Sequence, residues 1–333
     1  MTEAVRWAIL GTGKIARAFA AGLKDTPGAV LAAVASRGIG GAQAFADEFG
    51  AAAAFGSYQA LADASGIDIV YIATPHPMHA ENATMLLHGG KAVLCEKPFS
   101  MNRREAEQVV ALAREKKLFL MEAMWTRFMP ALEEVQRIIA AGEIGAVQLV
   151  TADFGFTATT DPLHRVNNPA LGGGALLDLG IYPLSIAAAL LGPVKSVVAQ
   201  AEMGETGVDI QTGFLMRHEG GAMSVCSCSF KGNTPAELTV SGELGHVRMN
   251  TQFHRTSSVT VVTKAGSRSI PTPFLGNGYV HEAIEAGRCL CAGLLESPGM
   301  THDETLALMG VLDDIRRQIG LVYAADQVRF HQT

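Results

Sequence analysis

The chain has 333 residues and a formal net charge of −6 at pH 7; 48% of its residues are hydrophobic and 17% are charged. A chain of this length can form two domains with sizeable cores, and so low a charge content excludes a largely disordered protein. The mild negative charge and the lack of any basic run argue against nucleic acid or an acidic membrane surface as a partner.

The first third of the chain alternates short apolar runs with helical patterns, which is typical of a parallel sheet with helical crossovers. Strands are predicted at 5–10, 30–35, 68–73, 91–95 and 118–122, and helices at 14–24, 42–49, 58–64, 79–87 and 102–115. We therefore expect residues 1–122 to form a dinucleotide-binding Rossmann domain of the α/β class.

The pattern changes after residue 123, where a helix is predicted at 130–141 and a strand at 146–156. Further strands are expected at 194–202, 209–216, 222–230, 236–241 and 245–249, before two closing helices at 280–292 and 303–320. Closely spaced strands without helices between them form antiparallel sheets. Residues 123–333 are thus predicted to be an α+β domain with an open, mostly antiparallel sheet. We assign substrate binding and oligomerisation to this domain as an expectation.

A glycine motif follows the first predicted strand, with Gly11, Gly13 and Ala16 in the spacing Gly-x-Gly-x-x-Ala. Gly11 allows a tight turn, Gly13 lets backbone amides approach a pyrophosphate, and Ala16 lets the helix pack closely on the strand. A plain strand-to-helix turn can have the same spacing, but the strand before it and the amphipathic helix after it favour a dinucleotide site. The predicted cofactor contacts in this segment are Gly11, Thr12, Gly13, Lys14 and Ile15.

The end of the second predicted strand bears on the choice of nicotinamide cofactor. An NAD enzyme usually has an Asp or Glu there to bind the ribose hydroxyls, whereas this chain has Ser36 and Arg37 and no acid before Asp47. A hydroxyl followed by a guanidinium suits the adenosine 2′-phosphate, because arginine presents a fork of donors to it. We therefore predict NADP(H) rather than NAD(H), the alternative for Arg37 being a solvent-facing loop residue.

The segment after the strand at 68–73 contains Thr74, Pro75, His76 and His79. A proline-containing turn at the carboxyl end of a sheet strand belongs in the cofactor crevice. Two histidines three residues apart could bind a metal, but no acidic or thiol partner lies nearby in the sequence, so no metal is predicted. A histidine that caps the next helix or lies along the nicotinamide ribose is the favoured interpretation, and all four residues are assigned to the cofactor site.

The run Glu96-Lys97-Pro98 ends the strand predicted at 91–95. A lysine at the carboxyl end of a strand in the same sheet would lie beside the cofactor, where hydride chemistry needs a proton donor or acceptor. Glu96 and Lys97 are therefore predicted to contact the cofactor, and Lys97 to act in catalysis.

The five cysteines are Cys95 and two pairs with one residue between them, at 226/228 and 289/291. This spacing lacks the gap of two to four residues that zinc sites use, so reduced, buried thiols are expected. The first pair falls on a strand pattern and should share one face, whereas the second falls on a helix pattern and should diverge.

Segments 11–16 (GTGKIA), 73–75 (ATP) with His79, 96–98 (EKP) and 172–182 (GGGALLDLGIY) together resemble the glucose–fructose oxidoreductase / inositol dehydrogenase (Gfo/Idh/MocA) family. The resemblance covers essentially the whole chain. Residues 121–128 (MEAMWTRF) and the glycine block most resemble the dihydrodiol dehydrogenase branch. That branch is similar to NADP-dependent D-xylose dehydrogenases and, more distantly, to anhydrofructose reductases.

The resemblance implies a catalytic lysine, which falls on Lys97. Many members have Asp-x-x-x-His on the helix after the glycines, whereas this chain has Asp178 and Tyr182, as the dihydrodiol branch does. Residues four apart share one helix face, so both side chains can face the crevice. The predicted catalytic residues are Lys97, Tyr182 and Asp178, the alternative for Tyr182 being a core aromatic on an apolar helix.

The chemistry agrees with this assignment, because oxidising an alcohol requires a base for the hydroxyl proton as the hydride leaves. An ammonium beside a phenol favours the phenolate, and partial burial disfavours the ammonium, so the lysine and the tyrosine can share this task.

The predicted substrate contacts are Trp125, Phe154, Asp178 and Tyr182. Arg127 is assigned to the cofactor, and Trp125 could equally be interdomain packing. Weaker candidates are His164, Arg165, His254 and Tyr279.

The expected function is hydride transfer between NADP(H) and a hydroxyl-bearing carbon of a sugar, polyol or cyclic diol. One alternative is a non-catalytic, NADP-responsive sensor or regulator of the same fold. Another is an enzyme that transfers hydride transiently within a different reaction, as NAD-dependent glycosidases do.

Two further expectations concern assembly and location. Apolar residues lie on both faces of the strand at 209–216, and Met223 and Val225 of the next strand add to them. A homodimer or homotetramer built on the antiparallel sheet is therefore predicted. No basic-then-apolar leader and no run of about 18 uninterrupted apolar residues occur, so we expect a cytoplasmic protein.

Overall fold

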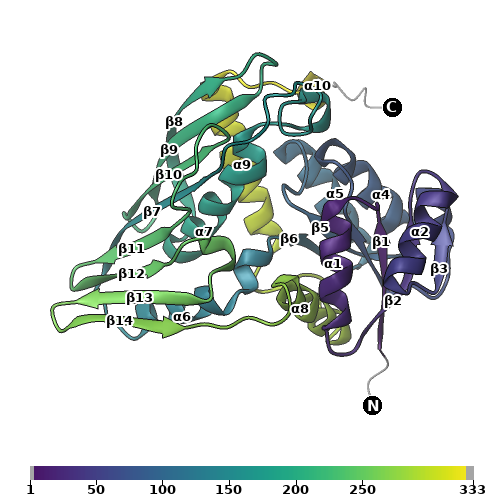
Figure 1. Cartoon of the computed structure of the whole chain (residues 1–333), viewed down its shortest axis with the longest axis horizontal. Coiled ribbons are helices and arrows are strands. Elements are labelled where there is room, and N and C mark those ends of the chain that lie inside the picture. Colours follow the sequence, from purple (N-terminus) through teal and green to yellow (C-terminus); the bar gives the residue numbers. More distant parts are fainter. Residues whose placement is uncertain (1–3, 328–333) are drawn as a thin grey trace. The chain divides into compact units, whose positions relative to one another are not determined.

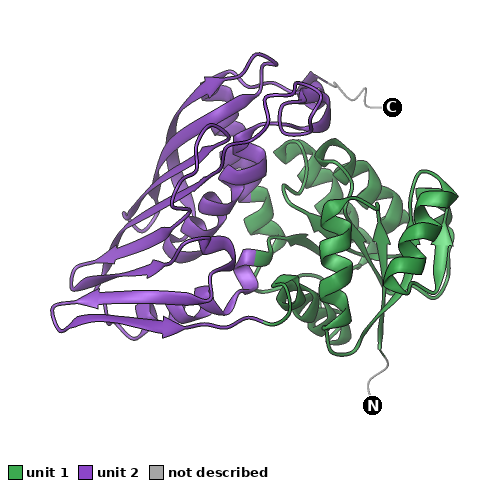
Figure 2. Ribbon diagram, viewed as in Figure 1, with its two compact units in different colours: residues 1–125, 275–306 green, residues 126–274, 307–333 purple. Residues whose placement is uncertain are grey.

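The computed structural model describes residues 4–327, which fall into two compact units (Figure 2). Unit 1 holds the residues up to Trp125 together with Leu275–Leu306, and unit 2 holds Thr126–Phe274 and the described residues from Ala307 onward. The division predicted at 122/123 therefore needs a correction, because 275–306 return to unit 1. The physical reason is that helix α8 (Tyr279–Cys291) packs on α1 (Lys14–Lys24), with the Asn277 amide donating to Ala18 O at 2.7 Å.

Unit 1 is a six-stranded, fully parallel sheet in the order β3-β2-β1-β4-β5-β6 (Figure 1). Its strands are β1 (Val5–Leu10), β2 (Ala29–Ala35), β3 (Ala53–Phe55), β4 (Ile69–Ile72), β5 (Ala92–Glu96) and β6 (Leu120–Ala123). Its further helices are α2 (Ile39–Phe49), α3 (Tyr58–Asp63), α4 (His79–His88) and α5 (Arg103–Lys116). Strands β4, β5 and β6 are buried along their whole length, as expected where helices cover both faces of a parallel sheet. The predicted Rossmann fold is confirmed.

The strand order reverses between β1 and β4, and ligands of such sheets bind at the carboxyl ends of the strands at this point. Gly11 ends β1 there with a φ of 106°, and a Cβ on it would lie 2.9 Å from the Ala73 carbonyl oxygen. Only glycine fits so close an approach of two backbones at positive φ.

Unit 2 is built on an eight-stranded sheet in the order β14-β13-β12-β11-β7-β10-β9-β8, antiparallel except where β7 and β10 pair in parallel (Figure 1). The strands are β7 (Val147–Gly155), β8 (Val194–Met203), β9 (Asp209–His218), β10 (Met223–Ser229), β11 (Leu238–Gly242), β12 (Gly245–Met249), β13 (Ser258–Thr263) and β14 (Gly266–Pro271). The predicted α+β class with a mostly antiparallel sheet is confirmed, and β13 and β14 extend it beyond the predicted strands.

One face of this sheet is covered by helices α6 (Pro130–Ala140) and α7 (Ile181–Leu191) and by the π-helix η4 (Leu176–Gly180). Helix α9 (His302–Ile319) begins in unit 1 and continues into unit 2, and the short α10 (Ala324–Gln327) follows it. The covered side of β9 and β10 is buried, including Thr212, Phe214, Met216, Cys226 and Cys228. The uncovered side of the same strands and β8 exposes Val198, Leu215, Met223 and Val225. Cys226 and Cys228 are buried on the same side of β10, and Cys289 is buried whereas Cys291 is exposed, so the predicted shared face and divergence are confirmed. The expectation of a buried thiol is wrong for Cys291, which lies on the exposed side of α8.

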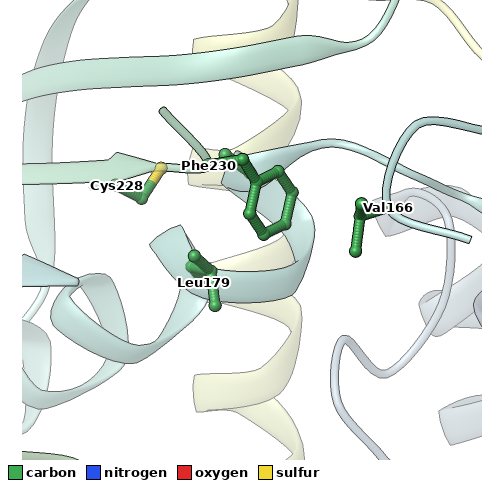
Figure 3. Packing of buried hydrophobic residues seen from close by; sticks show 5 residues of the cluster. Val166, Leu179, Cys228 and Phe230 are labelled. Atoms are coloured by element: carbon green, nitrogen blue, oxygen red, sulfur yellow. The ribbon is translucent and has the colours of Figure 1, made fainter. Parts of the chain in front are cut away.

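A buried cluster fixes the π-helix against the sheet (Figure 3). It joins Leu179 of η4 and Ala175 just before it to Cys228 and Phe230 at the end of β10, and to Val166 of the loop before the glycines. The π-helix belongs to the stretch Pro169–Leu191, in which a window of 18 residues has a mean hydropathy of 1.7, enough for a membrane span. However, 78% of that window is buried inside the protein, which is the pattern of a core helix.

Candidate functional site

The glycine loop of unit 1 leaves the start of helix α1 open for an anion. Gly13 is the N-cap, no side chain caps the helix, and its first turn holds no acidic residue. A Cβ on Gly13 would meet nothing within 4 Å, so the space beside the first backbone N–H groups is open. Unpaired N–H groups at a helix N-terminus bind phosphates well, and the residues present therefore fit a dinucleotide pyrophosphate. Around them, Lys14 is exposed and Thr12 and Ile15 are half-buried.

The residues after β2 offer a cation where the adenosine ribose would bind. The Ser36 N–H donates to Phe55 O at 3.1 Å, so this segment is anchored to the end of β3. Arg37 is exposed and lies close enough to Tyr58 to lower its pKa, although burial raises that pKa more. The backbone before Arg37 is thus anchored, and the exposed guanidinium next to it fits a phosphate partner.

The segment after β4 corrects one prediction. Thr74 is buried and its hydroxyl accepts from Asn82, whereas Pro75 is exposed and His76 half-buried. His79 is fully buried, with Nδ1 2.8 Å from Pro98 O and Nε2 2.9 Å from Thr74 O. Both ring nitrogens therefore face backbone carbonyls, and the ring ties two loops together instead of contacting the cofactor as predicted.

Two buried carboxylates fix the backbone on either side of Lys97. Glu96 accepts the Tyr71 hydroxyl on one oxygen and the Lys97 N–H at 3.1 Å on the other. Glu122 accepts the Phe99 N–H at 3.0 Å. Charged acceptors of backbone N–H groups are stronger than neutral ones, so the turn after β5 presents the half-buried Lys97 side chain from a rigid frame.

A third carboxyl, Glu282 of α8, lies in the same part of unit 1 and was missed by the sequence analysis. It is fully buried, and burial together with the charge of Glu96 raises its pKa well above the usual range. Burial therefore favours the neutral form of this carboxyl. Its position among Val280, Ala283 and Ala286 on the buried face of α8 is the one sequence signal that could have revealed it.

Unit 2 supplies the other two predicted catalytic residues from one continuous helical stretch. Asp178 lies in η4 and Tyr182 in α7, and both are buried, with 6% and 7% of their surface exposed. The Arg165 guanidinium pairs with Asp178 at 3.0 Å, which places the weaker candidate Arg165 beside the predicted catalytic carboxylate. The Phe154 ring packs edge-on against Tyr182 at 5.4 Å and stacks on His254 at 4.5 Å. Unit 2 therefore brings the predicted residues Phe154, Asp178 and Tyr182 into one region.

The predicted pair Trp125 and Arg127 is divided between the units. Trp125 is buried in unit 1 and stacks on Tyr279, with the ring centroids 4.4 Å apart. Arg127 belongs to unit 2, where its Nε donates to Ser185 at 2.9 Å. Their assignments to substrate and cofactor remain predictions. Among residues 4–327, no group of three or more His, Cys, Asp or Glu side chains is placed to hold a metal ion.

Comparison with known proteins agrees with this arrangement. The model of an oxidoreductase family with an NAD-binding Rossmann fold matches residues 5–124, and that of the GFO/IDH/MocA C-terminal domain matches residues 132–248. The chain belongs to the Gfo/Idh/MocA oxidoreductase family. The resemblance inferred from the motifs is thereby confirmed.

Curated relatives of this Gfo/Idh/MocA protein extend over nearly its full length. The trans-1,2-dihydrobenzene-1,2-diol dehydrogenase of Danio rerio is 36% identical over 333 residues, covering 97% of this chain and 99% of the relative. The mouse (Mus musculus) enzyme of the same name is 35% identical, with the same coverage. The prediction that the chain is a nicotinamide-dependent dehydrogenase or reductase is thus confirmed, which disfavours the non-catalytic sensor.

Solved structures of the family show the same fold. KijD10, a 3-ketoreductase from Actinomadura kijaniata in complex with NADP and TDP-benzene, superposes with a TM-score of 0.86 at 24% identity, covering 95% of this chain and 98% of that one. A levoglucosan dehydrogenase in complex with NADH and levoglucosan gives a TM-score of 0.88 at 19% identity, with coverages of 96% and 97%.

Proposed function

We propose that this protein is an NADP-dependent dehydrogenase that oxidises a hydroxyl-bearing carbon of a cyclic diol, sugar or polyol. The observation that carries the proposal is its similarity to dihydrodiol dehydrogenases over 97% of the chain. Lys97, Asp178 and Tyr182 are all present, which an enzyme needs and a passive nucleotide sensor does not. Hydrogen bonds hold the N–H of Lys97 and that of Leu176, two residues before Asp178. The exposed Arg37 and the absence of an acid at the end of β2 support NADP over NAD.

The proposed roles follow from the chemistry of these side chains. Bound NADP would supply the acceptor for the hydride that leaves the carbinol carbon. Tyr182 takes the hydroxyl proton, and the ammonium of Lys97 favours the phenolate form that can do so. Asp178, held by Arg165, accepts a hydrogen bond from a second substrate hydroxyl and orients the substrate. The stacked rings of Phe154 and His254 offer an aromatic wall to a ring-shaped substrate.

A panel of alcohols tests the proposal. The purified protein is mixed with NADP⁺ or NAD⁺ and with trans-1,2-dihydrobenzene-1,2-diol, D-xylose, levoglucosan or a linear polyol, and NADPH or NADH formation is followed by absorbance. We expect catalytic NADPH formation with at least one cyclic diol or sugar. Binding of NADPH without turnover of any compound in the panel would overturn the proposal.

Replacing Arg37 by alanine should change cofactor selectivity. Loss of charge-assisted hydrogen bonds to the 2′-phosphate should raise the Kd for NADPH about 10- to 100-fold and leave the Kd for NADH nearly unchanged, because NADH lacks that phosphate. Fluorescence titration measures both constants. Arg317→Ala, which removes an exposed arginine of unit 2, is the matched control. Equal weakening of both cofactors, or tighter binding of NADH by the wild type, would contradict the assignment.

The exposed side of β8, β9 and β10 leads us to propose that a second copy of the chain covers it. Val198, Leu215 and Val225 expose 65%, 39% and 47% of their surface on these neighbouring strands, and open apolar sheet faces are typical association surfaces. Leu215→Glu combined with Val225→Glu should therefore yield monomers, whereas Val322→Glu, at an exposed position outside the sheet, should not. Light scattering that shows a wild-type monomer of 35.0 kDa at micromolar concentration would refute this.

A further inference from the structure

A buried aspartate that the sequence analysis did not single out lies at the start of the helical stretch that carries Asp178 and Tyr182. Asp209 is the first residue of β9 and is fully buried. Its Oδ2 accepts the Leu176 N–H and the Thr212 hydroxyl, both at 2.7 Å. Its Oδ1 has no hydrogen-bond partner among residues 4–327. A half-satisfied buried carboxylate costs stability, so its presence calls for another explanation.

The hydrogen bond to Leu176 controls where the helical stretch begins. Leu176 is the first residue of η4, two residues before Asp178, and η4 continues directly into α7, which carries Tyr182. The N–H groups of a first helical turn have no partner within the helix, and a carboxylate is the acceptor best suited to them. Movement of Leu176 would therefore shift both side chains.

The glycines before the helix leave space for this carboxylate. A Cβ on Gly174, whose φ is 123°, would lie 2.4 Å from Asp209 Oδ1 and 3.0 Å from the Tyr323 hydroxyl oxygen. A Cβ on Gly173 would lie 2.8 Å from three backbone atoms of the 165–168 segment. The Tyr323 hydroxyl donates to Gly173 O, so a second element holds the same turn. The glycine run thus lets the turn close around Asp209.

We propose that Asp209 is a positioning residue, whose buried carboxylate holds the start of the helix so that Asp178 and Tyr182 stand where the reaction needs them. This inference rests on the proposed function for the roles of those two residues. The hydrogen bond and the burial on which it is built lie entirely within unit 2.

The surroundings of Asp209 make its charge sensitive to pH. Burial raises its pKa to about 6, against the opposing hydrogen bonds from Thr212 and Leu176. The titratable groups that face it are Cys228 of β10 and Tyr323 after α9, and burial raises the pKa of both, so they are neutral at neutral pH. Behind Tyr323, Arg316 is paired with Asp313 and Asp326. Proton uptake therefore falls on Asp209, and a neutral acid accepts the Leu176 N–H more weakly.

The test compares Asp209→Asn with the wild type across pH. We expect kcat at neutral pH to fall about 10- to 100-fold, as for misplaced catalytic groups, with an unchanged Kd for NADPH. The wild-type kcat should also decline as pH drops through about 6, and this acid limb should be missing from the variant. Asp68→Asn, which alters a carboxylate that accepts a backbone N–H in unit 1, is the matched control. A kcat close to that of the wild type, or a change of kcat near pH 6 that is the same in Asp209→Asn as in the wild type, would overturn the inference.

The stability of the folded protein should change with pH in the opposite direction to kcat. The folded-state pKa of Asp209 exceeds its ordinary value of 3.8, so protonation favours the folded protein, and this gain is lost as pH rises through about 6. Asp209→Asn should therefore match or exceed the wild-type Tm at neutral pH, and the wild type should recover as pH falls from about 6 toward 4. A variant that is less stable at neutral pH and otherwise normal in kcat would show a merely structural role and overturn the inference.

A second variant and a spectroscopic probe cover the remaining outcomes. Thr212→Val keeps the Asp209 carboxylate but removes a hydrogen bond that lowers its pKa. The decline of kcat near pH 6 should therefore move to higher pH in this variant. A decline at the same pH as in the wild type would contradict the inference. If the wild type oxidises no alcohol, the proposed function fails by itself. In that case the amide resonance of Leu176 is followed across pH in the wild type and in Asp209→Asn. A shift of this resonance near pH 6 that occurs only in the wild type supports the hydrogen bond from Asp209 to the helix start, and the absence of such a shift overturns the inference.

Discussion

Replacing Lys97 with methionine is expected to lower kcat by about 100- to 10,000-fold, the usual contribution of a general acid–base group. Methionine keeps the length and apolar bulk of the side chain but removes the ammonium, which in the proposed mechanism favours the Tyr182 phenolate. The frame around position 97, in which Glu96 accepts its N–H and Glu122 that of Phe99, does not depend on the ammonium. The Kd for NADPH and the Tm should therefore stay close to the wild-type values.

The tyrosine provides the partner experiment. Tyr182→Phe should lower kcat in the same range, and the double variant should be little worse than either single one, because residues that act as a unit are not additive. Lys264→Met, at an exposed position in the β13–β14 turn, is the control for the loss of a lysine charge. Retention of more than about a tenth of the wild-type kcat by folded, NADPH-binding Lys97→Met and Tyr182→Phe would remove this mechanism.

Gly174→Ala is expected to cause the largest loss of stability. The added Cβ would lie 2.4 Å from Asp209 Oδ1, and alanine would have to adopt a φ of 123°. Backbone strain and overpacking each cost about 1–3 kcal/mol, so the free energy of unfolding should drop by roughly 2–6 kcal/mol. Urea denaturation followed by circular dichroism measures the change, and kcat should fall as well because the helix start shifts.

Gly207 separates the two causes. Its φ is 83°, but a Cβ there would meet nothing within 4 Å. Gly207→Ala should therefore cost only the left-handed backbone penalty of about 1–2 kcal/mol and leave kcat unchanged. Equal losses of stability in the two variants would contradict the close packing of Gly174 against Asp209.

The fold could be predicted wherever local pattern and tertiary structure agree. The apolar runs of β1, β4 and β5 are local features, and so are the hydrogen-bonded caps at Asn102 and at Thr301 with Glu304; the strands and the helices that these caps begin were predicted. Strand β14 was missed because its largely exposed sequence, GSRSIP, has no apolar alternation. The return of 275–306 to unit 1 was missed because it depends on long-range contacts such as Asn277 with Ala18, which leave no local signal.

The residues of the candidate site could likewise be predicted only where a local sequence pattern marks them. Motif glycines and Lys97 could be found because their spacing reflects the chemistry of a cofactor. Asp209 could not, because a single sequence does not distinguish a buried carboxylate at the start of a strand from an exposed one. Glu282 was missed although its position among apolar residues on the buried face of α8 is a signal that the sequence contains. His79 was misassigned because its partners, the carbonyls of Thr74 and Pro98, are backbone groups that any residue could supply.

The central claim, direct hydride transfer from a carbinol carbon with Lys97 and Tyr182 moving the proton, is tested most directly by isotope tracing. The best alcohol of the panel is prepared with deuterium on its carbinol carbon and incubated with NADP⁺ and either the wild type or Lys97→Met. The account predicts deuterated NADPH from the wild type and almost none from the variant in the same time. NADPH without deuterium, or equal rates of label transfer in the two proteins, would contradict it.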